Sequence, residues 1–162
     1  MTGALNGWAA LEPEHDLAAA RLLADCASLG TAATAEAAIA AVRADADSDI
    51  YGWLDGGQLV AVYGLRKGKL QFDLLWLAVD PRWRGQRYGR SALVDALRRC
   101  GRKPMTVEVG ESVKGWFERI GFRVVGRKPT AEGFRYRLGW YAPRRPDEPG
   151  FGAHGAGAER RS

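Results

Sequence analysis

The stretch that decides the fold is LLWLAVDPRWRGQRYGRSALVDALRRCG, residues 74–101. Its apolar run is typical of a central strand covered on both faces, and Pro81 ends that strand because proline has no N–H for the ladder. Residues 86–99 then carry a helical period that Gly101 terminates. Four side chains of this helix are expected to face inward: Tyr88, Leu93, Val94 and Leu97. The segment therefore predicts a strand, a turn and a helix.

The turn between strand and helix has the composition of an anion site. N–H groups in the first turn of a helix are free to bind an anion, and the helix dipole adds positive charge. Glycine allows close backbone approach, and arginine adds charge-assisted hydrogen bonds. The residues that fit this arrangement are Arg84, Gly85, Gln86, Arg87, Tyr88, Gly89 and Arg90. The turn is neither a Walker loop nor a Rossmann fingerprint, because GxxxxGK[ST] and GxGxxG are absent.

The rest of the chain alternates between strand and helix patterns. Strands are expected at residues 8–11, 50–55, 59–65, 70–79, 105–109, 122–125 and 134–140. Helices are expected from about residue 14 or 16 to Gly30, and at 35–44, 86–99 and 113–120. Residues 143–162 have almost no core-forming side chains and are predicted to be a flexible tail after a single domain over 1–142.

Composition is that of a soluble globular protein, with 162 residues, 46% hydrophobic and 27% charged. The formal charge of +5 permits an anionic partner without identifying one. Neither Cys26 nor Cys100 has a CxxC or histidine neighbour, so both are expected to be reduced, buried thiols, and no metal site is predicted. Because no signal peptide and no apolar run of about 18 residues is found, we expect a cytoplasmic protein without a membrane partner.

The turn resembles the acyl-CoA pyrophosphate loop of the GNAT superfamily of N-acetyltransferases, whose pattern is [QR]-x-x-G-x-[GA]. Arg84 fills the first position and Gly89 the last, whereas Arg87 replaces the first glycine. The strand ending LAVDPRWRG and the later segment WFERIGFRVVGR resemble other family segments, and the element order also agrees. The resemblance covers about residues 6–141. It implies an α/β (α+β) fold with a mixed, mostly antiparallel sheet of about six or seven strands and about four helices.

The resemblance implies acetyl-CoA as co-substrate and assigns residues to it. The backbone of Leu77, Ala78 and Val79 would lie along the pantetheine like an added strand. The N–H groups of residues 84–90 would hold the pyrophosphate, and Ser91 could add a hydroxyl. Either Arg82 or Arg87 would face the 3′-phosphate of the adenosine.

Acetyl transfer to an amine needs a base that takes the amine's proton. Asp73 lies six residues before Val79, where histone-acetylating members of the family have a carboxylate. An apolar strand is expected to raise the pKa of Asp73. The alternative is that Asp73 caps a turn or pairs with an arginine. Glu108, near the end of the next strand, is the second candidate base.

The residue that often serves as general acid in this family, which protonates the departing thiolate, is absent at the corresponding position of this sequence. Phe117 stands where the family often has a tyrosine, and Gly110 where it often has an asparagine. Either water or another hydroxyl protonates the thiolate, or the chain is a non-catalytic acyl-CoA-binding sensor. A third hypothesis, a nucleic-acid binder, rests on interleaved basic and aromatic residues, but no RNP-type or helix-turn-helix motif supports it. The favoured hypothesis is an N-acetyltransferase acting on a primary amine of a small molecule, peptide or protein, in a chain that could form homodimers as many relatives do.

Overall fold

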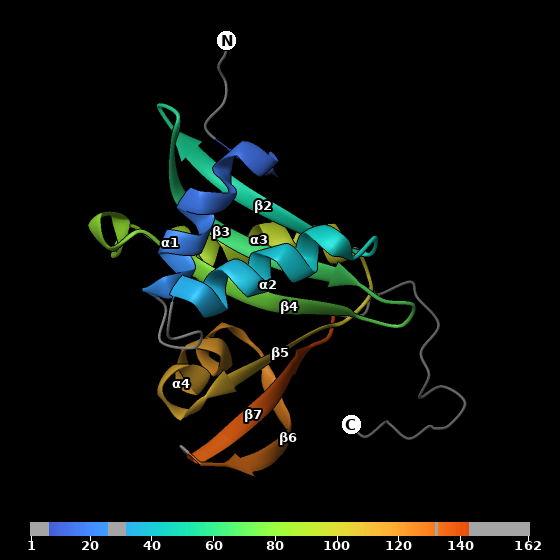
Figure 1. Ribbon diagram of the computed structural model, residues 1–162. Coiled ribbons are helices and arrows are strands. Elements are labelled where there is room, and N and C mark those ends of the chain that lie inside the picture. Colours follow the sequence, from blue (N-terminus) through green and yellow to red (C-terminus); the bar gives the residue numbers. More distant parts are fainter. Residues whose placement is uncertain (1–6, 26–31, 132, 143–162) are drawn as a thin grey trace, which may run out of the picture.

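The computed structural model describes residues 7–25, 32–131 and 133–142, so the predicted tail, Cys26 and Gly30 lie outside the described residues (Figure 1). One sheet has the strand order β1-β2-β3-β4-β5-β7-β6. Its strands are β1 (Trp8–Ala10), β2 (Ser48–Asp55), β3 (Gln58–Lys67), β4 (Phe72–Val79), β5 (Met105–Gly110), β6 (Arg123–Thr130) and β7 (Gly133–Trp140). The α-helices are α1 (Asp16–Ala24), α2 (Ala32–Ala44), α3 (Tyr88–Cys100) and α4 (Glu111–Ile120). Two short 3-10 helices are η2 (Pro13–His15) and η3 (Pro81–Trp83).

The element order confirms the expected mixed fold. Every pair of neighbouring strands is antiparallel except β4 and β5, which run parallel. The β2–β3 hairpin turns at Gly56 and Gly57, whose φ values are 60° and 84°. Such a turn matches the right-handed twist of the strands, and side chains with a Cβ rarely adopt it. The glycine pair therefore accounts for the hairpin predicted from the sequence.

Helices cover both faces of the β1–β4 part of the sheet. The helices α1 and α2 pack over β2, β3 and the end of β4, while α3 covers the opposite face (Figure 1). The buried side of α3 is centred on Ala92, Leu93, Ala96 and Cys100. Val94 is 44% exposed, so its expected inward orientation is wrong. One residue along a helix turns the side chain by about 100°, which carries Val94 away from this buried side.

A β-bulge at Leu75 interrupts the central strand. Opposite β3, Leu65 pairs with Leu74 and Gly64 pairs with Trp76, which leaves Leu75 as an extra residue. Consequently Leu74 packs in the core beneath α3, whereas Trp76 packs in the core beneath α1 and α2. The uninterrupted apolar run is thus a strand that changes faces at the bulge. The strand also begins at Phe72, two residues later than expected.

Strands β4 and β5 separate soon after they meet. Their pairing covers only residues 72–74 of β4 and 105–107 of β5. Beyond it β4 stays paired with β3 as far as Val79, and β5 stays paired with β7 as far as Gly110. In Figure 1 the β5–β7–β6 part of the sheet turns away from the β1–β4 part. The sheet is therefore wedge-shaped at its centre, beside the turn singled out by the sequence.

A buried polar cluster fixes α3 to β3. The Tyr63 hydroxyl donates to a carboxylate oxygen of Asp95 at 2.5 Å, and Arg99 Nε donates to the same oxygen at 2.9 Å. Burial, followed by the bond and the charge of Asp95, raises the pKa of Tyr63. The cluster holds the helix that begins at the arginine-rich turn in a single position against the sheet.

Candidate active site

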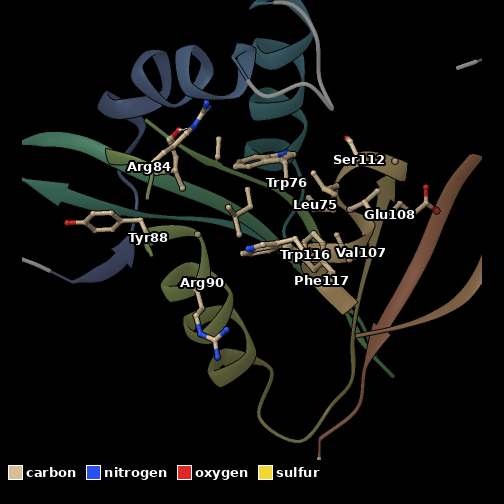
Figure 2. A pocket seen from close by; sticks show the side chains of 18 of the residues that line it. Leu75, Trp76, Arg84, Tyr88, Arg90, Val107, Glu108, Ser112, Trp116 and Phe117 are labelled. Carbon is tan, nitrogen blue, oxygen red and sulfur yellow. Dashed lines mark hydrogen bonds between the residues drawn. The ribbon is translucent and has the colours of Figure 1, made fainter. Parts of the chain in front are cut away.

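The wedge between β4 and β5 encloses a cavity of about 860 Å³, here called the main cavity. Its walls come from β4, the turn before α3, the start of α3, β5, α4 and one residue of β7. The lining residues are Leu74–Val79, Arg84, Gly85, Arg87–Arg90, Val107–Gly110, Ser112, Val113, Trp116, Phe117 and Arg135. In Figure 2, Leu75 and Trp76 from β4 face Trp116 and Phe117 from α4. The main cavity is apolar at its centre and cationic beside the turn.

The turn before α3 is shaped by two left-handed residues. Gly85 has φ 83° and Arg87 has φ 68°, and Arg87 is the only described non-glycine residue with a positive φ. A side chain in this conformation costs about 1–2 kcal/mol, which gives a physical reason for glycine at this position of the family pattern. Despite that cost, α3 begins directly afterwards at Tyr88. Its first-turn N–H groups therefore lie at the end of the main cavity.

Three arginines line the main cavity, namely Arg84 and Arg87 of the turn and Arg90 in the first turn of α3. Arg84 Nε also donates to the carbonyl oxygen of Val79 at 3.2 Å, which ties the turn to the end of β4. Arg82 instead pairs with Asp80 at 2.8 Å and does not line the main cavity. The positive charge at this end therefore comes from Arg84, Arg87 and the first turn of α3, whereas the Arg90 side chain points away from the other labelled lining side chains in Figure 2.

Nine of the eleven residues predicted to bind the cofactor line the main cavity; the exceptions are Gln86 and Ser91. The Ser91 hydroxyl accepts a hydrogen bond from the Trp8 indole at 2.9 Å. The Tyr88 side chain points away from the cavity in Figure 2 and packs against Trp53 and Trp83. Tyr88 therefore contributes to the site as the first residue of α3, and its side chain does not point into the cavity.

The α4 side of the main cavity carries Phe117, which is 6% exposed and stacks edge-on against Trp116. Among the described residues, the hydroxyl groups of the lining are those of Tyr88 and Ser112. Ser112 lies in the first turn of α4 and is labelled among the lining residues in Figure 2. The sequence analysis missed Ser112, although its position just after Gly110, at the start of a helix, was the available signal.

Asp73 lines a second cavity of about 400 Å³, here called the side pocket. The side pocket is lined by Arg66, Gln71, Asp73, Leu74, Leu75, Thr106, Val107, Glu108, Arg135 and Arg137. One carboxylate oxygen of Asp73 accepts hydrogen bonds from Thr106 at 2.6 Å and Gln71 at 3.2 Å, and the other accepts one from Arg66 at 2.7 Å. Burial acts to raise the pKa of Asp73, but these hydrogen bonds together lower it below its ordinary value. The expected rise is therefore wrong, and Asp73 pairs with an arginine.

Glu108 lies where the two cavities meet, since it lines both of them. Its carboxylate lies 3.7 Å from Lys128 Nζ and 3.9 Å from Arg137 Nη1, and the side chain is 43% exposed. Ion pairs of this length and exposure are weak. Unlike the Asp73 carboxylate, the Glu108 carboxylate is thus held only by two long ion pairs.

Two general features of the described residues bear on other kinds of site. No helix in the described ranges is both long and apolar enough to cross a membrane. Within the same ranges, no group of three histidine, cysteine, aspartate or glutamate residues could hold a metal ion. Cys100 is a free, buried thiol, and burial raises its pKa to about 12.

The sheet opens between its two parallel strands, and a cationic turn and the start of a helix lie at the opening. These features are those of the acyl-CoA-dependent transferases, the class that the sequence resembles. The chain belongs to the GNAT acetyltransferases: the sequence model of the Acetyltransferase (GNAT) domain matches residues 19–137. Acetyl-CoA is the co-substrate of this family. No curated protein sequence matches the chain significantly.

Several solved structures share the fold. An aminoglycoside 6′-N-acetyltransferase complexed with coenzyme A is similar at 15% identity and a TM-score of 0.71, over 86% of this chain and 99% of that one. The ribosomal-protein-S18-alanine N-acetyltransferase from Escherichia coli is similar at 18% identity and a TM-score of 0.70, over 89% and 98%. The PaiA N-acetyltransferase from Thermoplasma acidophilum, in complex with coenzyme A, is similar at 14% identity and a TM-score of 0.62, over 83% and 98%. At these identities the likeness concerns the fold alone.

Proposed function

We propose that this protein transfers an acetyl group from acetyl-CoA to a primary amine. The observation that carries the proposal is the main cavity, whose lining includes a cationic turn at one end and Glu108 elsewhere. A transferase needs both features, because the anionic part of the donor must be anchored while its acyl group meets a deprotonated amine.

The lining suits each part of the donor molecule. Leu77, Ala78 and Val79 line the part of the main cavity assigned to the pantetheine chain and present apolar side chains to it. The first-turn N–H groups of α3 together with Arg84 and Arg87 suit a pyrophosphate. The bound donor supplies the acetyl group as a thioester.

The described residues suggest how the transfer proceeds. The amine nitrogen attacks the thioester carbonyl, a C–N bond forms, the C–S bond breaks, and the departing thiolate takes a proton. We assign proton removal from the amine to Glu108, since the oxygens of Asp73 are already engaged by three donors. Ser112 is the lining hydroxyl assigned to the protonation of the thiolate, because Phe117 has no proton to donate; as its proton passes to the sulfur, the serine takes another from water, so that it stays a neutral hydroxyl.

A second candidate function is acyl-CoA binding without turnover. It is favoured by Phe117 at the position of the usual tyrosine and by the left-handed Arg87, which costs stability where the family has glycine. In this alternative the turn still binds acyl-CoA, and the carboxylates have no catalytic role.

A thiol-release assay over a panel of primary amines distinguishes the two functions. Acetyl-CoA should be consumed only when an acceptor amine is present, and an acetylated amine should appear in equal amount. Acetyl-CoA binding without any thiol release across the panel would favour the sensor. The domain boundary at residue 142, a cytoplasmic location and a homodimer stay predictions from the sequence.

A further inference from the structure

The side pocket adjoins the main cavity and is rich in guanidinium groups. Five residues line both spaces, namely Leu74, Leu75, Val107, Glu108 and Arg135. The two cavities are therefore adjacent, and Glu108 belongs to the lining of both. Three arginines line the side pocket against two carboxylates.

One of the three arginines is neutralised within the protein. Arg66 donates to a single Asp73 oxygen through Nη2 at 2.7 Å and Nε at 3.3 Å. The pair leaves Arg66 and Asp73 without net charge. The remaining positive charge of the side pocket is that of Arg135 and Arg137.

Arg135 and Arg137 keep most of their donors for a ligand. Two residues apart on β7, they project to the same side of the sheet. Arg135 Nη2 donates to the backbone carbonyl oxygen of Glu108 at 3.1 Å, and Arg137 lies 3.9 Å from the Glu108 carboxylate, beyond hydrogen-bonding distance. Each guanidinium has five N–H donors in a planar fork that matches a carboxylate or phosphate.

We propose that the side pocket binds the acceptor, and that the acceptor is a small molecule with a carboxylate or phosphate close to its primary amine. The acid group lies against Arg135 and Arg137, and the amine lies against Glu108, which lines both the side pocket and the main cavity. A volume of about 400 Å³ is that of a small-molecule site. This inference rests on the proposed function, because it assigns the acceptor of that same reaction.

The test compares amines in matched pairs that differ in one acid group: tyrosine with tyramine, lysine with cadaverine, and phosphoethanolamine with ethanolamine. Each charge-assisted hydrogen bond is worth about tenfold to a hundredfold, so kcat/KM should be higher for the acid-bearing member by that factor. The carboxylate and phosphate pairs show which anion is preferred. Equal or better use of the neutral members overturns the inference while leaving the proposed function standing.

Arginine variants locate the effect. R137A and R135A should each reduce the preference for the acid-bearing amine, measured as the ratio of its kcat/KM to that of its neutral partner, by about tenfold. The matched control is R98Q, which removes a positive charge from the exposed outer side of α3, away from both cavities, and should leave the preference unchanged. A preference that survives both R137A and R135A overturns the assignment.

Calorimetry keeps the inference testable when no amine is acetylated, a result that would contradict the proposed function. The protein saturated with coenzyme A should bind the acid-bearing member of a pair more tightly than the neutral member, and R137A should reduce the difference about tenfold. Equal affinities overturn the inference. Acetylation of an acidic tetrapeptide, with none of the small amines used, overturns the small-molecule assignment.

Discussion

Glu108 and Asp73 should respond oppositely to isosteric neutralisation. The E108Q change removes the assigned base, and a positioned base contributes about a hundredfold to ten-thousandfold, so kcat/KM should fall by that factor. The two ion pairs of Glu108 are 3.7 and 3.9 Å long, and its side chain is 43% exposed. The free energy of unfolding of the E108Q protein should therefore differ from that of the wild type by no more than about 0.5 kcal/mol. In Asp73→Asn the amide keeps one acceptor but loses the charge opposite Arg66. The free energy of unfolding should fall by about 1–2 kcal/mol, with kcat/KM changed less than tenfold.

The assay for this pair of variants is thiol release at saturating acetyl-CoA, together with urea unfolding of each protein. Glutamine has the size of glutamate, so a loss in E108Q reports on the proton-accepting group and not on packing. The reasoning is refuted when D73N loses turnover by more than a hundredfold and E108Q stays near the wild type. In that case Asp73 is the base despite its three hydrogen-bond donors.

Three further outcomes are expected. Ser112→Ala should lower kcat about tenfold or more without changing the affinity for acetyl-CoA; an unchanged kcat would leave thiolate protonation to water. Asp95→Asn should lower the free energy of unfolding by about 2–3 kcal/mol in urea titrations, because Arg99 loses its buried counter-ion and Tyr63 its charged acceptor; a loss under 0.5 kcal/mol would contradict this. Because the pKa of Asp73 is lowered in the folded protein, its bonds stabilise fully above the ordinary value of 3.8 and are lost as pH falls through the folded value. Stability should therefore decline less steeply in D73N than in the wild type between about pH 5 and 2; identical slopes would contradict the shift.

Local patterns predicted the strands and helices because each depends on neighbours in the chain. The strand that Pro81 ends, the hairpin at Gly56 and Gly57, and the end of α3 at Gly101 all follow from backbone preferences of single residues. The part of the site formed by the turn before α3 could also be predicted, because the glycine and the arginines of the turn are adjacent in sequence to the start of α3.

The features that could not be predicted depend on contacts between residues far apart in the sequence. The bulge at Leu75 depends on how β4 registers against β3, and an apolar run of leucines carries no sign of it. The pKa of Asp73 was misjudged because its bonding partners Thr106 and Arg66 are supplied by other strands. Only the assembled sheet brings Arg135 and Arg137 beside Glu108, 27 and 29 residues earlier in the chain.

The central claim is that the main cavity binds acetyl-CoA through the turn before α3, and calorimetry of acetyl-CoA binding tests it most directly. A bulky side chain at Gly89 would project toward Trp116 and Val79 across the cavity, so G89W should block binding, whereas the control R98Q should not affect it. The account predicts one site per chain for the wild-type protein and for R98Q, and at least a hundredfold weaker binding for a folded G89W protein. Equal binding by all three proteins, or no binding by the wild type at millimolar acetyl-CoA, would contradict it.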